Sequence, residues 1–376
     1  MKKRLIFGTK LLITAALWLG AGLMLSTFLV GKEVGAVNAA AWNTEQVFQQ
    51  KLNNQVAPWL ADAVPAVKVT YRLNDQDLTA PKPDPNAFGQ TDDPAKVMEV
   101  VAQAEQLLEG GSTLFSEDTQ LMEGTSVTYY RDDTILAMTW KEAIGDCCYT
   151  FAEVKIADAS QFRRFMADGT YNSGKLYTTT EMSASVNAVL ASSGDYYGYR
   201  YFGVVVNDGH VYRCKGNHLD TCYIDDQGDL LFTYAQDIAD ETQAQAFVDE
   251  HNVRFSLSFG PVMILDGENV VPVRYNTGEI DKRFSRAALC QLDKLHYLVV
   301  AANMEGSYRK APTLYEFADN LVARGIQTAY TLDGGQTATI AMDSKLINTV
   351  SYGSQRDISD IIYFATAIPE SKEGTT

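Results

Sequence analysis

The sequence lacks the short motifs that mark many enzyme classes. It has no GxxxxGK[ST] phosphate loop, no HExxH zinc helix, no GxSxG nucleophile elbow and no GxGxxG after a strand pattern. Histidine is rare, and the four that exist are scattered: His210, His218, His251 and His296. A histidine-based triad or a histidine-rich zinc site is therefore not expected. Any chemistry has to rest on carboxylates, arginines, hydroxyls and glycine backbone.

Cysteine is also scarce, with five residues that form no CxxC pair and no zinc spacing. Cys214 and Cys222 are near enough in sequence to close a small loop as a disulfide in an oxidising compartment. The alternative is that the cysteines are small buried hydrophobic residues, above all Cys290 in its apolar stretch.

Positive charge is in deficit. The chain has 31 Lys and Arg against 47 Asp and Glu, a net charge of −16. A surface this acidic repels phosphate backbones, so nucleic acid is not an expected partner. The hydrophobic content of 46% is that of a globular protein, and 376 residues allow one large domain or two small ones.

Only one long apolar run exists, from Leu11 to Val30. About twenty residues are enough to cross a bilayer. The basic residues before the run are Lys2, Lys3, Arg4 and Lys10. They predict a single-pass cell-membrane protein whose bulk is extracytoplasmic. A cleaved signal peptide is the alternative, because Val37 to Ala41 offers small residues to a peptidase.

The rest of the chain divides by composition and pattern. The predicted parts are a cytoplasmic tip and transmembrane anchor (1–35), a stalk and linker (36–95), an N-terminal extension (96–149), a main domain (150–368) and a tail (369–376). The proline-rich residues 80–94 favour an extended linker or an ordered coil. A helix is predicted with Asp93 as its cap, Pro94 in its first turn and Gly110 at its end.

Strand patterns dominate from Gly124 onward, separated by turn signals such as Asn207 to Gly209. Two further helices are expected, around Thr242 to Asp249 and around Leu314 to Ala323. The expected fold class is α+β, with a large mixed-sheet domain and a few flanking helices behind the N-terminal transmembrane helix.

One candidate site lies where a strand pattern ends in Gly194, Asp195, Tyr196 and Tyr197. A carboxylate next to two aromatic rings is typical of a place where a sugar stacks. Upstream, Glu181 is a second candidate carboxylate. The structural alternative is that Glu181 forms a capping box with Thr178, and that Asp195 and the tyrosines form a turn.

A second candidate site is the stretch "TLDGGQTATI", residues 331 to 340. It is either a tight hairpin, with residues 337–342 returning as a strand, or a place where a ligand touches backbone. Arg286 stands just before a hydrophobic strand pair, and Ser258 precedes the Gly260-Pro261 corner, where backbone turns tightly. Glu316 is expected to be structural, because Thr313 can form a capping box with it.

Five of these segments together resemble the phosphodiester glycosidase family, in its bacterial exported branch. The family pattern is N-G-[GD]-F-[FY], S-F-G-P, R-T-A-[IL]-G, L-D-G-G-G-S-[SA]-T and R-x-[VI]-S-[ND]. The matching residues are Ser193-Gly194-Asp195-Tyr196-Tyr197, Ser258-Phe259-Gly260-Pro261, Arg286-Ala287-Ala288-Leu289-Cys290, Leu332-Asp333-Gly334-Gly335-Gln336-Thr337-Ala338-Thr339 and Arg356-Asp357-Ile358-Ser359-Asp360. The resemblance covers residues 150–368, and five segments in the right order are more specific than any one of them.

The resemblance implies hydrolysis of the bond between an anomeric sugar carbon and a phosphodiester oxygen. It suggests Asp333 or Glu181, with Asp195, as catalytic carboxylates and Arg286 as a fork for phosphoryl oxygens. The residues it implies for substrate binding are Gly334, Gly335, Thr337, Thr339, Tyr196, Tyr197, Gly194 and Ser258. A divalent cation shared by Asp195 and Asp333 is an open alternative, and no other cofactor is implied. The substrate would be a sugar-phosphate or glycan of an envelope or a host.

The sequence departs from the family pattern inside its motifs. Ser193, Ala287, Cys290, Gln336 and Thr337 stand where the family has Asn, Thr, Gly, Gly and Ser. Gln and Cys add bulk where glycine allows close backbone approach. A catalytically degenerate protein that binds carbohydrate or sugar-phosphate polymers is therefore the alternative to an active glycosidase.

Overall fold

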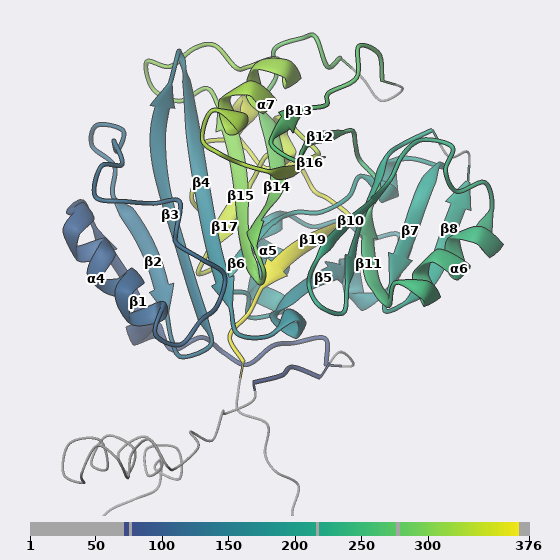
Figure 1. Cartoon of the computed structure of the whole chain (residues 1–376), viewed down its shortest axis with the longest axis horizontal. Helices are drawn as coiled ribbons and strands as arrows, with labels where there is room; N and C mark the ends of the chain where they lie inside the picture. The colour runs from purple at the N-terminus through teal and green to yellow at the C-terminus, as the bar shows by residue number, and fades with distance from the viewer. Residues whose placement is uncertain (1–70, 75–76, 216–217, 276–278, 368–376) are drawn as a thin grey trace, which may run out of the picture. The chain divides into compact units, whose positions relative to one another are not determined.

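Nine strands form the largest sheet of the protein, which a computed structural model describes over residues 71–74, 77–215, 218–275 and 279–367 (Figure 1). In spatial order they are β1 (Phe88–Thr91), β2 (Val127–Arg131), β3 (Ile135–Ile144), β4 (Cys147–Ile156), β15 (His296–Asn303), β14 (Arg286–Asp293), β16 (Thr328–Leu332), β12 (Val262–Leu265) and β13 (Glu268–Asn269).

Two five-stranded sheets complete the strand framework. One consists of β10 (Leu230–Thr233), β9 (Thr221–Asp225), β11 (Val253–Leu257), β7 (Gly203–Asn207) and β8 (His210–Lys215). The other consists of β18 (Lys345–Leu346), β17 (Ile340–Met342), β6 (Leu190–Ser193), β19 (Asp360–Phe364) and β5 (Phe162–Met166). The α+β class is confirmed. The described strands form three antiparallel sheets, however, and not one large mixed sheet.

Four α-helices flank these sheets: α4 (Pro94–Ala104), α5 (Thr179–Ser185), α6 (Glu241–Glu250) and α7 (Leu314–Val322). Short 3₁₀ turns are η1 (Pro85–Ala87), η2 (Ala159–Gln161), η3 (Ala167–Gly169), η4 (Tyr197–Tyr199), η5 (Gly335–Thr337) and η6 (Ser351–Gly353). The two helices predicted near residues 242 and 314 are confirmed. Asp93 caps α4 as predicted, but the helix ends at Ala104, well before Gly110, and Leu107 beyond it is exposed.

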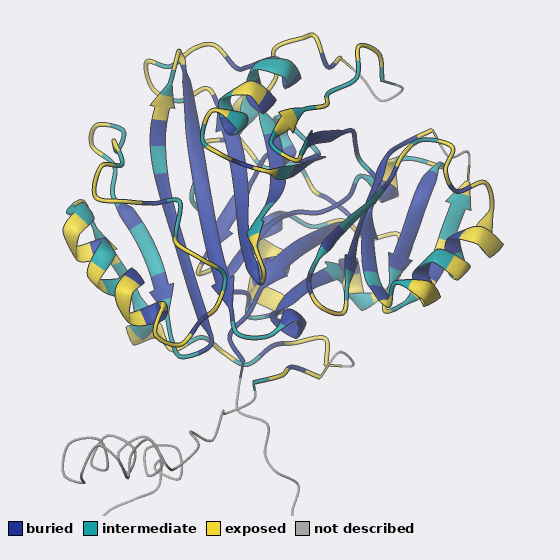
Figure 2. Cartoon of the chain, viewed as in Figure 1, coloured by how far each residue is buried: buried dark blue, intermediate teal, exposed yellow. Residues whose placement is uncertain are grey.

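The main core lies where the three sheets face one another. Phe162 of β5 stacks on Phe364 of β19 with ring centroids 4.6 Å apart, and it meets Phe255 of β11 edge-on at 5.3 Å. Tyr297 of β15 packs on the same cluster. A second core lies beneath α4 and α7 on the nine-stranded sheet. Figure 2 shows the strands as mostly buried and the outer helix faces as exposed. The loops that leave these cores are therefore held by rigid elements.

The proline-rich residues 80–94 are not simply a linker. Residues Phe88–Thr91 form β1, which pairs with β2, with Phe88 opposite Tyr130. Phe88 also packs on the ring of Tyr130 at 4.6 Å. The edge position explains how a proline-rich segment joins a sheet, because an edge strand has one row of N–H groups that needs no partner.

Several predictions on the N-terminal part cannot be followed. The expected anchor at 11–30, the stalk up to residue 70 and the tail from 369 lie outside the described residues. Within the part of the chain that the structure describes, none of the helices is long and apolar enough to span a membrane. The division at residues 36–95, 96–149 and 150–368 stays a prediction.

All five cysteines are free thiols in the structure, so of the two alternatives the unpaired one is found and the Cys214–Cys222 disulfide is not. Cys214 lies on β8 and Cys222 on β9, and β11 and β7 lie between these two strands in the sheet. Cys290 is fully buried in β14, in agreement with its interpretation as a small hydrophobic residue.

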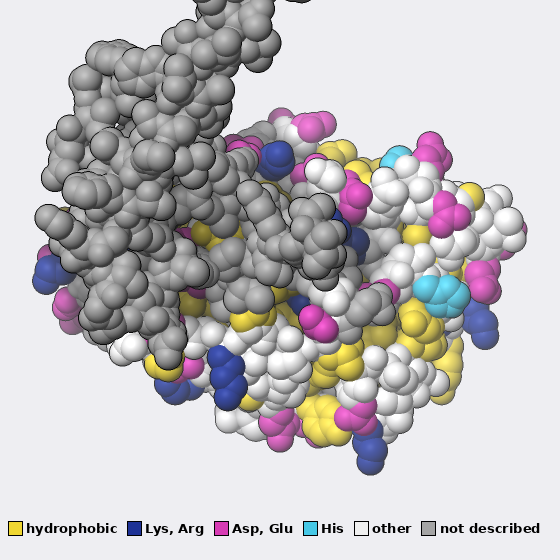
Figure 3. Space-filling view, turned by 90° about the horizontal axis from the view of Figure 1, so that it is seen from below, with side chains coloured by type: hydrophobic (Ala, Val, Ile, Leu, Met, Phe, Trp, Pro, Cys, Tyr) yellow, Lys and Arg dark blue, Asp and Glu magenta, His cyan; other side chains and the backbone are white. Residues whose placement is uncertain are grey.

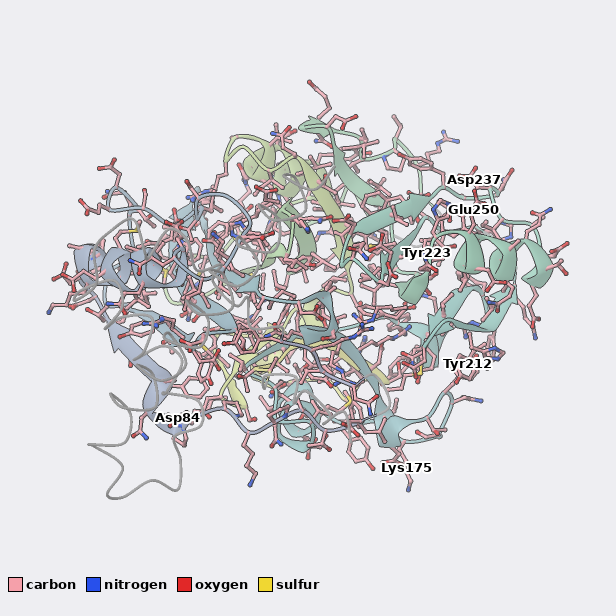
Figure 4. All side chains as sticks on the ribbon, turned by 60° about the horizontal axis from the view of Figure 1, so that its bottom comes forward. Asp84, Lys175, Tyr212, Tyr223, Asp237 and Glu250 are labelled. Carbon is pink, nitrogen blue, oxygen red and sulfur yellow. The ribbon has the colours of Figure 1, made fainter. Side chains whose placement is uncertain are left out.

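Charged side chains are interspersed with uncharged ones on one visible face of the protein. On the face seen in Figure 3, acidic side chains are dispersed among uncharged ones and do not gather in one patch. Figure 4 shows Tyr223 lying against α6, where its ring centroid is 4.7 Å from that of Phe247. That contact fixes α6 on its sheet and leaves Glu250 exposed.

Candidate functional site

The segment from Asp333 to Thr339 connects two different sheets. β16 ends at Leu332 in the nine-stranded sheet, and β17 begins at Ile340 and pairs with β6 in another sheet. The predicted hairpin is therefore wrong, and only residues 340–342 of the expected return strand exist. The crossing places Asp333 at the end of a buried strand, where a side chain can leave the core.

Each glycine in this segment has a structural reason, which is a close backbone approach at Gly334 and a positive φ at Gly335. A Cβ on Gly334 would lie 2.4 Å from the carbonyl oxygen of Ser285. Gly335 has a φ of +65°, and its N–H donates to the same carbonyl at 2.9 Å. The Thr337 hydroxyl donates to the Gly334 carbonyl at 2.7 Å. These bonds tie the segment to the start of β14 and keep it rigid.

Asp333 forms an ion pair with Arg356, whose Nη2 lies 2.5 Å from the carboxylate. The Asp333 side chain is 14% exposed and that of Arg356 34% exposed, so the pair sits at the surface of the core. Burial raises the pKa of Asp333 above its usual value, while Arg356, Thr337 and Arg200 oppose that rise. The cost of desolvating the carboxylate thus outweighs the attraction of two guanidinium groups.

Two stacked tyrosines lie beside this pair. The rings of Tyr196 and Tyr199 are 4.9 Å apart and nearly parallel, at 17°. The Arg356 guanidinium lies 5.1 Å from the first ring and 5.0 Å from the second. The Arg200 guanidinium lies 4.9 Å from Tyr196 and 4.7 Å from Phe259. Cation–π attraction therefore links both arginines to one aromatic surface, which we call the tyrosine platform (Tyr196 and Tyr199).

Buried charged side chains form hydrogen bonds and ion pairs that hold the backbone of the tyrosine platform in place. Asp195 accepts the N–H groups of Tyr196 at 2.6 Å and of Ser258 at 3.0 Å. Arg164 donates to Asp360 at 2.7 Å and lies 3.8 Å from Asp195. Burial raises the pKa of Asp360 to about 6, with Asp195 adding to the rise and Arg164 opposing it. Because every one of these side chains is buried, they hold the loop and do not face solvent.

Several residues that were predicted to bind substrate have packing or hydrogen-bonding roles inside the fold. A Cβ on Gly194 would lie 2.5 Å from the Asp360 carboxylate, so glycine is needed for packing there. The Ser258 hydroxyl donates to the Val204 carbonyl at 2.7 Å. Tyr197 is buried and lies under Arg164 at 5.3 Å. None of these three residues belongs to the tyrosine platform.

The side chains of Glu181 and Arg286 form hydrogen bonds with other parts of the fold. Glu181 accepts the N–H and hydroxyl of Thr178, so the capping box foreseen as the alternative is confirmed. Arg286 donates to the carbonyls of Glu279 at 3.0 Å and Lys282 at 2.6 Å. Burial lowers the pKa of Arg286 to about 10. Its guanidinium therefore holds a neighbouring loop in this structure.

Thr339 is likewise engaged within the fold. Its hydroxyl lies 2.7 Å from that of Thr179 on α5 and 3.2 Å from the Thr337 carbonyl. The capping box expected at Glu316 is confirmed as well, and Thr313 is its cap.

Arg356, Arg200 and Tyr199 are residues of the site that were not predicted from the sequence. Arg356 opens the last of the five family-like segments, and that was the available signal. Arg200 and Tyr199 follow Tyr197 closely in "YYGYR". No periodicity marks them, because η4 bends the chain so that Tyr199 returns over Tyr196.

The residues of the cluster are suited to hold a ring and an anion together. A carboxylate and two guanidinium groups adjoin an aromatic face, and Tyr199 is 40% exposed. The Nε of Arg356 is buried and makes no hydrogen bond to the residues that the structure describes. Among those residues, no group of three His, Cys, Asp or Glu side chains is arranged to hold a metal. Asp195 and Asp333 each face a guanidinium instead.

The residues of this cluster lie within a stretch of the chain that matches a known protein family. Residues 186–365 match the sequence model described as "Phosphodiester glycosidase". The fold is similar to the catalytic domain of zebrafish N-acetylglucosamine-1-phosphodiester α-N-acetylglucosaminidase, auto-inhibited by its pro-peptide. The TM-score is 0.50, with 16% identity over 63% of this chain and 85% of that one.

A hypothetical protein from Synechocystis is also similar, with a TM-score of 0.44 and 13% identity over 66% of this chain and 64% of that one. The curated proteins contain no match. The family resemblance expected from five segments is thus confirmed by the match that spans them from residue 193 onward. Residues 186–365 of this chain are thus similar in sequence to the phosphodiester glycosidase family.

Proposed function

We propose that the protein is a hydrolase that cleaves the bond between the anomeric carbon of a sugar and the oxygen of a phosphodiester. The observation that carries the proposal is the Asp333–Arg356 ion pair beside the tyrosine platform, within the family-matched residues. A sugar ring stacks on the platform, and the phosphate approaches the guanidinium groups of Arg356 and Arg200. The ring is thereby held with its anomeric carbon toward Asp333.

The two parts of the reaction, departure of the phosphate and stabilisation of the anomeric carbon, need different amounts of help from the protein. A phosphodiester oxygen is already a good leaving group, so protonating it helps less than in ordinary glycoside hydrolysis. The positive charge that develops at the anomeric carbon has to be stabilised, and we assign that role to the Asp333 carboxylate. The C1–O bond breaks, the leaving phosphate keeps its electron pair, and water adds its oxygen to C1 and releases a proton.

The departures from the family pattern support activity more than decay. Cys290 and Ala287 are buried inside β14, and Ser193 is buried in β6. Thr337 and Gln336 adjoin the cluster. The Thr337 hydroxyl keeps the polar group of the family's Ser, and the Gln336 amide lies 3.3 Å from the Ser354 carbonyl. That contact turns the added bulk toward η6 and its neighbours instead of toward Asp333. A binding-only protein remains the competing proposal, and turnover separates the two.

The proposal includes the cellular location of the protein. The basic residues before the apolar run at 11–30 favour a membrane-anchored protein with its family-matched part outside the cytoplasm. Substrates there would be sugar-1-phosphodiesters of envelope or host glycans.

The test is a turnover assay with the full-length protein and an α-linked sugar-1-phosphodiester such as UDP-N-acetylglucosamine. Release of free sugar that is lost in Asp333→Asn supports the proposal. Binding without turnover would favour the degenerate alternative. Free sugar released equally by Asp333→Asn would remove Asp333 from the reaction.

A further inference from the structure

Asp333 and Arg356 lie on two separate segments of the chain, and neither belongs to a helix or strand. Asp333 begins the segment that crosses from β16 to β17. Arg356 lies on the loop that follows β18 and contains η6, which we call the η6 loop (residues 347–356). An ion pair between two loops keeps its geometry only if other contacts hold the loops together.

Asn348 is a buried amide that joins the η6 loop to the crossing segment. It is 3% exposed, and its Oδ1 accepts the N–H of Ile340 at 2.7 Å. Its Nδ2 donates to the carbonyl of Ala338 at 2.7 Å and to that of Thr349 at 3.1 Å. The side chain therefore fixes the end of the crossing segment, at the point where β17 begins, against the start of the η6 loop.

Asn303, the last residue of β15, holds Asn348 from the nine-stranded sheet. Its Oδ1 accepts the Asn348 amide at 2.9 Å. Asn303 is 2% exposed, and its own Nδ2 is buried without a hydrogen-bond partner among the residues that the structure describes. A buried donor of this kind costs stability, whereas an apolar side chain there would leave no donor unpaired. The polar side chain at the end of β15 is therefore explained by its bond to Asn348 and not by packing.

Thr349, the next residue, is held at the same end of the sheet by Glu305. Lys141 of β3 donates to Glu305 at 2.6 Å, with side chains 15% and 20% exposed. Burial alone would raise the pKa of Glu305, but hydrogen bonds from Lys141 and Thr349 lower it below its usual value. Glu305 is therefore ionised and binds both groups. Lys141 precedes the family-matched residues 186–365, so an N-terminal strand helps to hold the loop that carries Arg356.

The η6 loop and the crossing segment meet again nearer the ion pair. The Ser351 and Ser285 hydroxyls are 2.9 Å apart, and the Ser285 carbonyl accepts the Gly335 N–H at 2.9 Å. Gln336 donates to the Ser354 carbonyl at 3.3 Å, but Ser354 is exposed. Hydrogen bonds in the low dielectric of the core are stronger than those in contact with water. We therefore expect the buried amide of Asn348 to contribute most to the alignment.

We propose that Asn348 is a positioning residue that sets the distance between the Asp333 carboxylate and the Arg356 guanidinium. It acts through backbone, on Asp333 through the crossing segment and on Arg356 through the η6 loop. The importance of this alignment for catalysis rests on the proposed function, whereas the alignment itself can be measured without turnover. A misplacement of about 1 Å in a catalytic group can lower the rate by about 10²-fold.

Gln161 provides a matched control. It is a buried amide on η2, and its Oε1 accepts the N–H of Ala157 at 3.1 Å. Its Nε2 donates to the carbonyl of Ala365 at 2.9 Å, beyond the end of β19 that is opposite to Asp360. Asn348→Ala and Gln161→Ala each remove a buried amide that links several segments. Both should lower the thermal midpoint, because each leaves buried backbone groups unpaired.

The test measures the coupling between Asp333 and Arg356 in the full-length protein. Carboxyl ¹³C NMR gives the pKa of Asp333, with Asp333→Asn to assign the signal, and Arg356→Gln should raise that pKa. We expect the rise to be smaller in an Asn348→Ala background and unchanged in a Gln161→Ala background. An equal rise in the Asn348→Ala background would overturn the proposal. If Asn348→Ala does not fold, Asn303→Leu removes one bond of Asn348; it should reduce the rise less, and no reduction would overturn the proposal.

Turnover separates this inference from the proposed function. We expect Asn348→Ala to lower kcat by about tenfold or more, and Gln161→Ala to leave kcat unchanged. Reduced coupling in Asn348→Ala, in a protein that cleaves no sugar-1-phosphodiester, would support the positioning role and refute the hydrolase. Turnover with both the coupling and kcat unchanged in Asn348→Ala would overturn the positioning role alone.

Discussion

Replacing Arg356 tests the electrostatic account of Asp333. In Arg356→Gln the carboxylate keeps its burial but loses the guanidinium that lies 2.5 Å away. Burial already raises the pKa of Asp333, and Arg356 is the first group that opposes the rise. The pKa of Asp333 should therefore rise further. Because the reaction needs the ionised carboxylate, the acid limb of the kcat/KM profile should move to higher pH.

The same substitution has a stability cost that can be bounded. Exposed ion pairs contribute about 0–1 kcal/mol, whereas removal of one partner from a fully buried pair costs about 3–5 kcal/mol. Side chains that are 34% and 14% exposed lie between these cases. We expect a loss of about 1–2 kcal/mol in the free energy of unfolding, measured by urea denaturation.

Arg324→Gln is the matched control. Arg324, which follows the C-terminal end of α7, forms a comparable ion pair with Glu142. Its side chain is 26% exposed and that of Glu142 is 6% exposed, and one nitrogen–oxygen contact is 2.7 Å. It should cost stability of the same order without moving the pH profile. An acid limb that stays in place or moves to lower pH in Arg356→Gln would refute the reasoning. A shift of equal size in Arg324→Gln would show that the effect is not specific to the site.

Three further predictions concern single residues. Asp333→Asn should lower kcat by about 10²-fold or more with the fold retained, as circular dichroism can verify. Glu181→Gln should leave kcat unchanged and lower the thermal midpoint slightly, because Glu181 only completes a capping box with Thr178; a loss of turnover would restore it as a catalytic candidate. Gly334→Ala should cost about 1–3 kcal/mol of stability and most of the activity, because its Cβ would meet the Ser285 carbonyl; an unchanged urea midpoint would contradict that.

Structural features that depend on neighbouring residues in the sequence, such as helix caps, were predicted correctly. Caps at Asp93, Thr178 and Thr313 were predictable, because a cap depends on residues within one turn. Long strands such as β15 and β16 were predictable from apolar content. The end of α4 was missed because residues 105–109 contain no glycine or proline that would mark a stop before Gly110.

Which strand pairs with which could not be predicted. The segment after Asp333 has the composition of a hairpin turn, and yet β17 pairs with β6 because the apolar residues of β17 complete a core between sheets. Sequence spacing carries no information on such a choice. The same limit hid the β1–β2 pairing of the proline-rich segment.

Some residues of the candidate site could be predicted from the sequence and others could not. Asp333, Gly334 and Tyr196 could be named, because a short motif requires them. Arg356 and Arg200 could not be assigned roles, since their proximity to Asp333 depends on η4 and η6 bringing distant loops together. The family resemblance implied a phosphate-binding role for Arg286, whereas its guanidinium donates hydrogen bonds to the carbonyls of Glu279 and Lys282.

The most direct test of the central claim is the bond that is cleaved. Hydrolysis of a sugar-1-phosphodiester by the full-length protein in ¹⁸O-labelled water distinguishes attack at carbon from attack at phosphorus. Our account predicts that water oxygen joins the anomeric carbon, so the released phosphate carries no ¹⁸O. A phosphate product that contains one ¹⁸O atom would show P–O cleavage and would contradict the account.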